Sequence, residues 1–372
     1  MKGEFVAINA ARDNARVLLA MSGGVDSAVS ALTLVEAGYR VVGMTMKNYC
    51  YGDFGTSAAP ERSCCSTEAI DDARAVCQRI GIRHLVVSTE EIFGREVYHN
   101  FLDEYRRGRT PNPCVRCNSI VRFETLVEWA DRMGFDCVAT GHYARVFRSA
   151  AGRTYVARST SRAKDQSYFL SALEPGVLDR VLFPLGDREK DEVRAHARDG
   201  GLRVADKPDS QEVCFISTRT LREFLDGKVE MAPGQVMTSA GEVVGHHDGL
   251  ASYTIGQRRG LGIAASRPQY VVKLDAATNT VVLGDDEDLF RRELSCDLAW
   301  IDALGARSAE PLTAQIRSRH GAERVSSLTI DNTTARIAFE TPQRAMAPGQ
   351  TIALYDGDVV VGSGVIAAAG SA

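Results

Sequence analysis

The chain has little that would place it in a membrane or in an oxidising compartment. Its 372 residues hold no uninterrupted apolar run of the roughly 18 residues that a membrane helix needs. The N-terminal MKGEFVAINAARDNA also lacks the apolar core of an export signal. The nine cysteines are an odd number for a disulfide framework, so we expect core residues, metal ligands or reactive thiols. These absences together predict a cytoplasmic protein without a membrane span.

The chain also lacks a net positive charge, and this limits how it could bind nucleic acid. The formal net charge is −4, which argues against a broadly basic nucleic-acid coat but leaves a local basic face open. The two tryptophans, Trp129 and Trp300, fall in apolar runs, so neither is expected to stack on a base. Three short basic clusters, taken alone, indicate solvated faces: Arg106 to Arg109, Arg258 with Arg259, and Arg317 to His320.

A Walker phosphate loop with its lysine is missing, and a different glycine-rich turn stands in the first strand–helix unit. The run from Val17 to Met21 is short and apolar, which predicts a buried parallel strand, and Ala28 to Glu36 has helical spacing. Between them lies Ser22-Gly23-Gly24-Val25-Asp26-Ser27. Two glycines let backbone N–H groups approach an anion at a helix N-terminus, the serines add hydroxyl donors, and Asp26 can reach a cation. This turn matches the pyrophosphate loop of ATP pyrophosphatases.

The first part of the chain, to about residue 210, alternates strand and helix patterns. Such alternation predicts a parallel sheet covered on both faces, with ligands at the carboxyl ends of its strands. The expected strands are Arg40 to Met46, His84 to Val87 and Cys137 to Thr140, and the expected helices Thr67 to Ile80, Glu91 to Tyr105 and Ile120 to Met133. The long segment from Lys47 to Ser66 is expected to be a functional or mobile loop.

The pattern changes after about residue 215, where short β-branched runs follow one another between glycines. Short strands at this spacing are typical of small β-barrels. We expect three domains: a catalytic α/β domain at 1–215, a small central β domain at 216–285 and a C-terminal β-barrel at 286–372. The Ala-rich C-terminus is expected to fray.

Two cysteine-containing segments could carry chemistry. In the first, GRTPNPCVRCN at 108–118, two prolines fix a loop that enters a helix, where a thiolate is stabilised. The second is KPDSQEVCFI at 207–216. A thiolate is the competent nucleophile, and a pair of thiols can hold a persulfide and then resolve it as a disulfide. Cys77 and Cys137 are expected to be core residues, and a zinc site at Cys50, Cys64 and Cys65 is disfavoured by their spacing.

With these segments in view, the chain resembles the bacterial tRNA-uridine 2-sulfurtransferases, or 2-thiouridylases. The resemblance implies a PP-loop ATP-pyrophosphatase domain of Rossmann-like type followed by two small β-rich domains. It covers nearly the whole chain and rests on SGGVDS, Met46-Lys47-Asn48, TPNPxxxCN, ATGHYA at 139–144, Lys164-Asp165-Gln166, Asp209 to Ile216, GxHxGLxxYTIGQRRGLG at 245–262 and Pro348-Gly349-Gln350.

The resemblance also assigns roles to matching positions. ATP would be held by Ala20, Met21, Ser22, Gly23, Gly24, Val25, Asp26, Ser27, Met46 and Gly141. Cys117 would be the nucleophile and Cys214 the persulfide carrier, while Asn112, Pro113 and Cys114 would flank the target base. Contacts to tRNA would come from His142, Lys164, Asp165, Gln166, Arg317, Ser318 and Gln350. Two positions depart from the family pattern: Cys114 replaces an Asp thought to assist base activation, and Ser318 replaces an aromatic residue.

The chemistry implied is thiolation of C2 of the wobble uridine in the tRNA anticodon stem-loop. ATP with Mg²⁺ would adenylate the C2 oxygen, releasing pyrophosphate, and the Cys214 persulfide would supply sulfur as AMP leaves. A Cys117–Cys214 disulfide would result and would need an external reductant. The uridine would be flipped out of its stack. A sulfur-donor protein or a cysteine desulfurase relay would reload Cys214.

Three alternatives stay open at this point. Cys114, Cys117 and Cys214 could instead bind a 4Fe-4S cluster with one open iron for hydrosulfide. An amidating ligase could share the nucleotide loop, but it would use ATP and Mg²⁺ without needing either Cys117 or Cys214. A non-catalytic RNA-binding module could use the C-terminal barrels beside a vestigial nucleotide site, and it would release no AMP.

Overall fold

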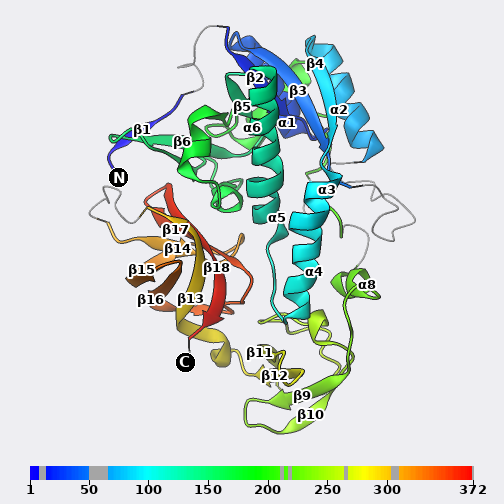
Figure 1. Cartoon of the computed structure of the whole chain (residues 1–372), viewed down its shortest axis with the longest axis vertical. Coiled ribbons are helices and arrows are strands. Elements are labelled where there is room, and N and C mark those ends of the chain that lie inside the picture. The colour runs from blue at the N-terminus through cyan, green and yellow to red at the C-terminus, as the bar shows by residue number, and fades with distance from the viewer. Residues whose placement is uncertain are drawn as a thin grey trace.

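The computed structural model describes residues 1–7, 14–49, 66–209, 213–216, 220–263, 267–302 and 310–370. Within these ranges the strands form three sheets (Figure 1). The predicted class, a parallel α/β part followed by β-rich parts, is confirmed. The expectation for Cys50, Cys64 and Cys65 falls outside the described ranges. In the part of the chain that the structure covers, no helix is both long and apolar enough to cross a bilayer.

The first part of the chain is built on a five-stranded parallel sheet in the order β4-β3-β2-β5-β8. Its strands are β2 (Arg16–Ala20), β3 (Arg40–Lys47), β4 (Arg83–Ser88), β5 (Cys137–Ala139) and β8 (Val181–Leu182). Side chains of β2 alternate between two cores: Val17 and Leu19 pack on one face and Leu18 on the other. Burial on both faces is the reason that this strand reads as a continuous apolar run.

Helices cover both faces of this sheet. α1 (Val25–Glu36), α2 (Thr67–Ile80) and α7 (Lys190–Asp199) contribute to the core beneath Val17, whereas α6 (Glu124–Met133) contributes to the core beneath Leu18. The amphipathic pattern places the bounds of α2 correctly, and Ser66 caps it by accepting a hydrogen bond from the Ala69 amide at 3.1 Å.

Two helical runs lead from the sheet toward the other parts of the molecule (Figure 1). The first is a single run through α3 (Glu90–Phe93), a π-type turn η2 (Gly94–Tyr98) and α4 (His99–Arg106). The second begins at α5 (Pro113–Arg116) and continues through a π-type segment η3 (Cys117–Phe123) into α6. Single π-type turns inside helices are frequent at functional sites. Short 3-10 turns lie elsewhere: η4 (Ser167–Leu170), η5 (Pro175–Arg180), η6 (Leu250–Ser252) and η7 (Glu287–Leu289).

A nine-stranded sheet joins both ends of the chain, in the order β1-β6-β7-β18-β13-β16-β15-β14-β17. It comprises β1 (Gly3–Phe5), β6 (Ala144–Ser149), β7 (Thr154–Arg158), β13 (Phe290–Ile301), β14 (Thr313–Gln315), β15 (Glu323–Asp331), β16 (Thr334–Arg344), β17 (Thr351–Asp356) and β18 (Val359–Ala369). The β6–β7 hairpin lies within the expected first domain, yet Ala157 pairs with Val359 of β18. We keep the three-domain division as a proposal about folding units.

The Ala-rich segment expected to fray is ordered as far as residue 370. β18 runs to Ala369, and Ala369 pairs with Leu294 of β13. Backbone pairing in the sheet therefore orders an Ala-rich segment whose composition alone gives little reason for order.

A small four-stranded sheet lies between these two parts along the chain, in the order β10-β9-β12-β11. Its strands are β9 (Gly234–Thr238), β10 (Val243–His247), β11 (Tyr270–Asp275) and β12 (Thr280–Gly284). The helix α8 (Leu221–Leu225) precedes it, with Thr220 and Glu223 forming a capping box. In Figure 1 this sheet lies at the end of α4 away from the parallel sheet.

Candidate active site

The nucleotide loop follows β2 as predicted and is shaped by its first glycine. Gly23 has φ +70°, and a Cβ there would lie 2.2 Å from the carbonyl oxygen of Ala69 in α2. Ser27 turns its hydroxyl back into the loop, where it donates to the Gly24 carbonyl at 3.1 Å and accepts from the Ser22 amide at 3.2 Å. The loop is therefore fixed in shape by its own serine, and it leads straight into α1.

Two more residues predicted for ATP come from neighbouring strand ends. Gly141 follows β5 and lies so close to the first turn of α1 that a Cβ would be 2.8 Å from the Ser27 amide nitrogen. Met46 lies near the carboxyl end of β3 and is buried. The fold thus gathers Gly141 and the loop at the carboxyl edge of the sheet, the position where open α/β sheets bind ligands.

Asp26 is held by two side chains from distant parts of the sequence. Lys190, the first residue of α7, places its Nζ 2.8 and 2.9 Å from the two Asp26 carboxylate oxygens. The Tyr143 hydroxyl donates to the same carboxylate at 2.9 Å. Burial, together with the Asp26 charge, raises the pKa of Tyr143, which keeps this hydroxyl a donor. Sequence reasoning missed both partners, because neither is near Asp26 in the chain.

The side chains at the carboxyl edge of the sheet fit a Mg²⁺ ion bound with ATP better than they fit a 4Fe-4S cluster. Mg²⁺ in nucleotide sites is held by one or two carboxylates together with substrate phosphates, a demand that Asp26 beside the loop can meet. A 4Fe-4S cluster needs three protein thiolates in one place. Among the described residues, no three His, Cys, Asp or Glu side chains gather as a ligand set. The structure therefore lends no support to the cluster alternative for Cys114, Cys117 and Cys214.

The first thiol segment is a capped helix start. Asn112 is the N-cap of α5 and accepts a hydrogen bond from the Val115 amide at 3.3 Å, with Pro113 in the first turn. Cys114 and Cys117 follow within one turn, and both side chains are half-buried. A thiol near a helix N-terminus has its thiolate stabilised by the helix dipole. The local fold therefore favours reactive thiols here.

The second thiol segment meets the first at one apolar cluster. Cys117 and Cys214 both pack against the core formed by residues including Phe93, Val121 and Phe215. The Tyr49 hydroxyl donates a 2.7 Å hydrogen bond to the Cys214 carbonyl. Two segments nearly one hundred residues apart in sequence are thus brought to one apolar cluster.

The loop before Asn112 is held by the C-terminal barrel. The Thr110 amide donates to the Pro348 carbonyl at 2.8 Å, and the Gln350 amide group donates to the carbonyls of Thr110 and Pro111 at 2.9 and 3.3 Å. Gln350, predicted to touch tRNA, thus lies against the loop that leads into α5.

His142, also predicted to touch tRNA, is buried and hydrogen-bonded at both ring nitrogens. Arg122 Nη1 lies 3.2 Å from Nε2, and Thr140 Oγ1 lies 2.8 Å from Nδ1. Because a guanidinium only donates, Nε2 must accept and Nδ1 must carry the proton. Burial and the Arg122 charge hold the pKa of His142 well below its ordinary value, so the ring is neutral.

Each residue of the Lys164-Asp165-Gln166 turn makes a side-chain contact with a different part of the protein. Lys164 Nζ lies 2.9 Å from Asp209, in the segment that leads to Cys214. Asp165 accepts from the Ser159 amide at 2.9 Å and the Ser167 hydroxyl at 2.7 Å. The Gln166 side chain accepts from the Tyr143 amide at 2.9 Å. The turn thus connects the nucleotide edge to the second thiol segment.

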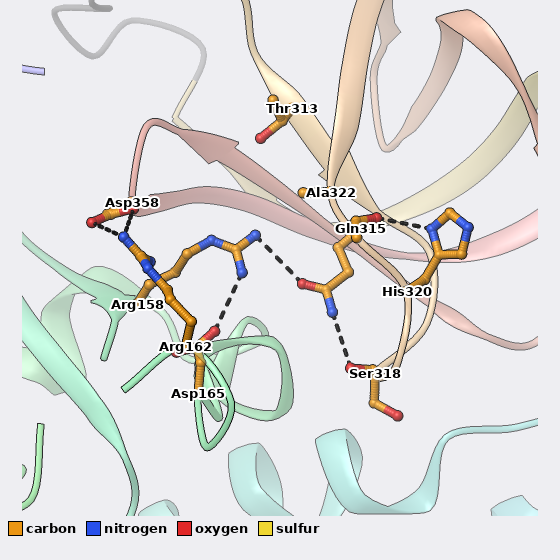
Figure 2. Close-up of a pocket in the computed structure, with 10 residues that line it drawn as sticks. Arg158, Arg162, Asp165, Thr313, Gln315, Ser318, His320, Ala322 and Asp358 are labelled. Atoms are coloured by element: carbon orange, nitrogen blue, oxygen red, sulfur yellow. Dashed lines mark hydrogen bonds and ion pairs between the residues drawn. The ribbon is translucent and has the colours of Figure 1, made fainter. Parts of the chain in front are cut away.

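Asp165 and Ser318, both predicted for tRNA, line one polar pocket of about 430 Å³ (Figure 2). Arg158 pairs with Asp165 at 3.3 Å, and its other arm reaches the Gln315 side-chain oxygen at 3.5 Å. Gln315 in turn donates to the carbonyls of Arg317 and Ser318 at 3.1 and 3.2 Å. The pocket lies between the β7–η4 connection and the β14–β15 loop, which brings these distant predicted residues together.

Comparison with known proteins matches three family models in chain order. Residues 15–218 match the tRNA methyl transferase HUP domain, residues 222–285 the tRNA methyl transferase PRC-barrel domain, and residues 294–366 the aminomethyltransferase beta-barrel domain.

Curated relatives match over nearly the whole length of both chains. The tRNA-specific 2-thiouridylase MnmA of Acetivibrio thermocellus is 42% identical over 357 residues, covering 94% of this chain and 99% of its own. The protein of the same name from Geobacter metallireducens is 44% identical over 361 residues, covering 95% and 97%. The one from Symbiobacterium thermophilum is 43% identical over 363 residues, covering 94% and 92%.

Proposed function

This chain belongs to the tRNA-specific 2-thiouridylase family, and we propose that it replaces the C2 oxygen of the tRNA wobble uridine by sulfur at the expense of ATP. A tRNA-modifying sulfurtransferase is the activity at the level of the family. The finer assignment, with adenylation followed by persulfide transfer, is our proposal. One observation carries it: two half-buried cysteines from distant segments pack against one apolar cluster, in a chain whose first strand–helix turn has the pyrophosphate-loop sequence.

The first step uses the nucleotide edge. The C2 oxygen of uracil is a poor leaving group, so it must be activated before sulfur can replace it. It attacks the α-phosphorus of ATP, and pyrophosphate leaves. Loop amides from Ser22 to Ser27 and the α1 N-terminus stabilise charge on the departing pyrophosphate. Mg²⁺, held by Asp26 and the phosphates, would supply further charge neutralisation. The uridine must leave its stack to reach this edge, with Asn112, Pro113 and Cys114 lining its place.

The second step uses the thiol pair. The terminal sulfur of a persulfide on Cys214 forms a bond to C2, and AMP leaves with the C2 oxygen. The Cys117 thiolate then attacks the Cys214 sulfur, which breaks the bond between the two persulfide sulfurs and leaves sulfur on the base. The resulting Cys117–Cys214 disulfide is reduced by an external dithiol. A persulfide-bearing donor protein or cysteine desulfurase relay reloads Cys214 in the cytoplasm.

The family models are described as methyl transferases, whereas the relatives are named thiouridylases. Methyl transfer to a base needs a methyl donor but neither a pyrophosphate loop nor a thiol pair. Both features are present in this chain, which supports sulfur transfer.

The decisive experiment is mass spectrometry of tRNA nucleosides after incubation with enzyme, ATP, Mg²⁺ and a persulfide donor. We expect 2-thiouridine and equimolar AMP from the wild type, and none of the thiolated nucleoside from Cys117→Ser or Cys214→Ser under persulfide-donor conditions. The half-buried Cys137→Ser serves as the matched control. AMP release without any 2-thiouridine, in the wild type and in both cysteine variants, would support an amidating ligase, and no AMP from the wild type would support an RNA-binding module.

A further inference from the structure

One ammonium group bridges the nucleotide loop and the segment that carries Cys214. Lys190 Nζ lies 2.8 Å from Asp26 Oδ1 and 2.7 Å from Asp209 Oδ1. The Lys190 side chain is only 11% exposed, and its two partners are 32% and 26% exposed. Asp26 belongs to the loop, whereas Asp209 lies five residues before Cys214. An ammonium group that is shielded from solvent and makes short contacts with two carboxylates links them more strongly than an exposed ion pair would.

Asp209 is the anchor of this arrangement on the thiol side. Besides Lys190, it accepts from Lys164 at 2.9 Å and Arg194 at 3.0 Å. Burial raises the pKa of Asp209, but hydrogen bonds from Lys190 and Lys164 outweigh it and lower the pKa to about 2. The carboxylate is therefore charged at any working pH, and it holds three cations around one point.

The backbone before Asp209 is fixed from the same helix. Arg194, one turn after Lys190 in α7, donates to the carbonyls of Ala205 and Lys207 at 2.6 and 3.1 Å. Lys207 pairs with Asp72 of α2 at 2.6 Å, and its Nζ lies 3.4 Å from the Gly23 carbonyl. The approach to Cys214 thus runs along the nucleotide loop and contacts it at Gly23 as well as through Lys190.

We propose that Lys190 is a positioning residue that clamps the segment leading to Cys214 against the nucleotide loop. The functional meaning of the clamp rests on the proposed function of Cys214. Without the ammonium, Asp209 would keep Lys164 and Arg194, but the cation that joins it to Asp26 would be lost and the two carboxylates would repel. Residues 203–209 would then separate from the loop, and Cys214, five residues beyond Asp209, would lose an anchor of its segment.

The test uses the full-length protein without substrates, so that thiol accessibility is measured apart from activity. Iodoacetamide labelling of Cys214, followed by peptide mass spectrometry, reports how firmly its segment is held, and hydrogen exchange of residues 203–209 reports the same for the backbone. We expect Lys190→Met to speed labelling of Cys214 about tenfold and to deprotect 203–209, since both report local opening. Lys190→Arg should restore both to within about twofold of wild type.

The matched control is Arg198→Met. Arg198 lies on the same helix and pairs with Asp206 at 3.0 Å, but its side chain is 55% exposed and its partner is 79% exposed. We expect wild-type labelling and exchange in this variant. Thermal unfolding of every variant checks that it is folded, and Asp209→Asn, which leaves the Lys190–Asp26 contact in place, gives a second route to the same opening if Lys190→Met does not fold.

The double variant Lys190→Met with Asp209→Asn separates a clamp from two independent effects. If the pair acts as one unit, the double variant labels no faster than the faster single variant. Additive rate increases would overturn the proposal, and so would unchanged labelling in Lys190→Met accompanied only by a higher KM for ATP. The clamp and the proposed function fail separately: a wild type that makes no 2-thiouridine but shows this labelling pattern would retain the clamp and refute the function.

Discussion

The side-chain amide of Gln350 donates a hydrogen bond of 2.9 Å to the carbonyl oxygen of Thr110, across 240 residues of sequence. A residue of the C-terminal barrel therefore shapes the loop that leads to Cys117. A Cβ on the adjacent Gly349 would lie 2.9 Å from the same Thr110 carbonyl, so the two backbones are in close contact. The barrel is part of the machinery that positions the first thiol segment.

Replacing Gln350 by Ala should release this loop. Because small misplacements of reacting groups cost large factors in rate, we expect sulfur transfer to fall by about tenfold or more. Iodoacetamide labelling of Cys117 should become faster even without tRNA. Gln235→Ala, at an exposed position in β9, is the control. A higher KM for tRNA with unchanged Cys117 labelling would show instead that Gln350 acts by touching tRNA.

Replacing Asn112 by Ala should destabilise the start of the α5 helix. The variant loses the acceptor for the Val115 amide and should cost about 1 kcal/mol in the free energy of unfolding, measured by urea denaturation. Asn112→Asp keeps the acceptor and places a negative charge at a helix N-terminus, so it should unfold like the wild type. Equal losses in both variants would assign the stability to the 3.4 Å contact between the Asn112 side chain and the Tyr168 hydroxyl.

The burial of His142 should appear in the pH dependence of stability. Burial and Arg122 lower the pKa of His142 in the folded state, so below the ordinary histidine pKa of about 6.5 only the unfolded chain takes up the proton. The free energy of unfolding should therefore fall as the pH drops below about 6.5, by up to about 1.4 kcal/mol per pH unit from this residue.

Denaturation curves from pH 7.5 to 5 test this dependence. His142→Gln should flatten the slope below pH 6.5 relative to the wild type, whereas the exposed His246→Gln should keep the wild-type slope. His84 and His247, whose pKa values burial also lowers, contribute to all three curves. The difference between the curves isolates His142, and identical slopes would contradict its neutral, buried state.

Cys114 stands where the family pattern has an Asp, and its role can be separated from that of the other thiols. A persulfide route uses two thiols, so Cys114→Ser should retain sulfur transfer within about threefold. Cys114→Asp, which restores the family residue, should transfer sulfur at least as fast as the wild type. Anaerobic purification with iron and sulfide analysis accompanies both variants. Abolished transfer in Cys114→Ser together with iron loss would establish the cluster route instead.

The strand, turn and helix around Ser22–Ser27 could be predicted from the sequence because the residues that determine them are close together in the chain. The apolar run of β2, the Ser22–Ser27 turn and the helical spacing of α1 lie within about twenty consecutive residues, and each uses a rule of strand, turn or helix formation. The agreement extends to α2, whose bounds follow from an N-cap serine and a glycine in left-handed conformation at its end.

The partners of these local elements could not be found the same way. Lys190 and Asp209 meet Asp26 only because α7 packs beside α1, which no local pattern encodes. The 12-residue strand β13 was also missed, because its sequence FRRELSCDLAWI alternates imperfectly and is interrupted by two bulges against β18. The β6–β7 hairpin was missed because it interrupts an α/β pattern.

The contacts of Thr110 with Pro348 and Gln350 carry a consequence for synthesis on the ribosome. The parallel sheet and its helices are complete once about the first two hundred residues have emerged, and domains generally fold as they appear, at roughly 5–20 residues per second. The loop ahead of Cys117, by contrast, can form its contacts only after Pro348 and Gln350, near the end of the chain, have been synthesised. A nascent or truncated product ending before Pro348 would lack these contacts, so the loop ahead of Cys117 would take its final shape only when translation is nearly finished.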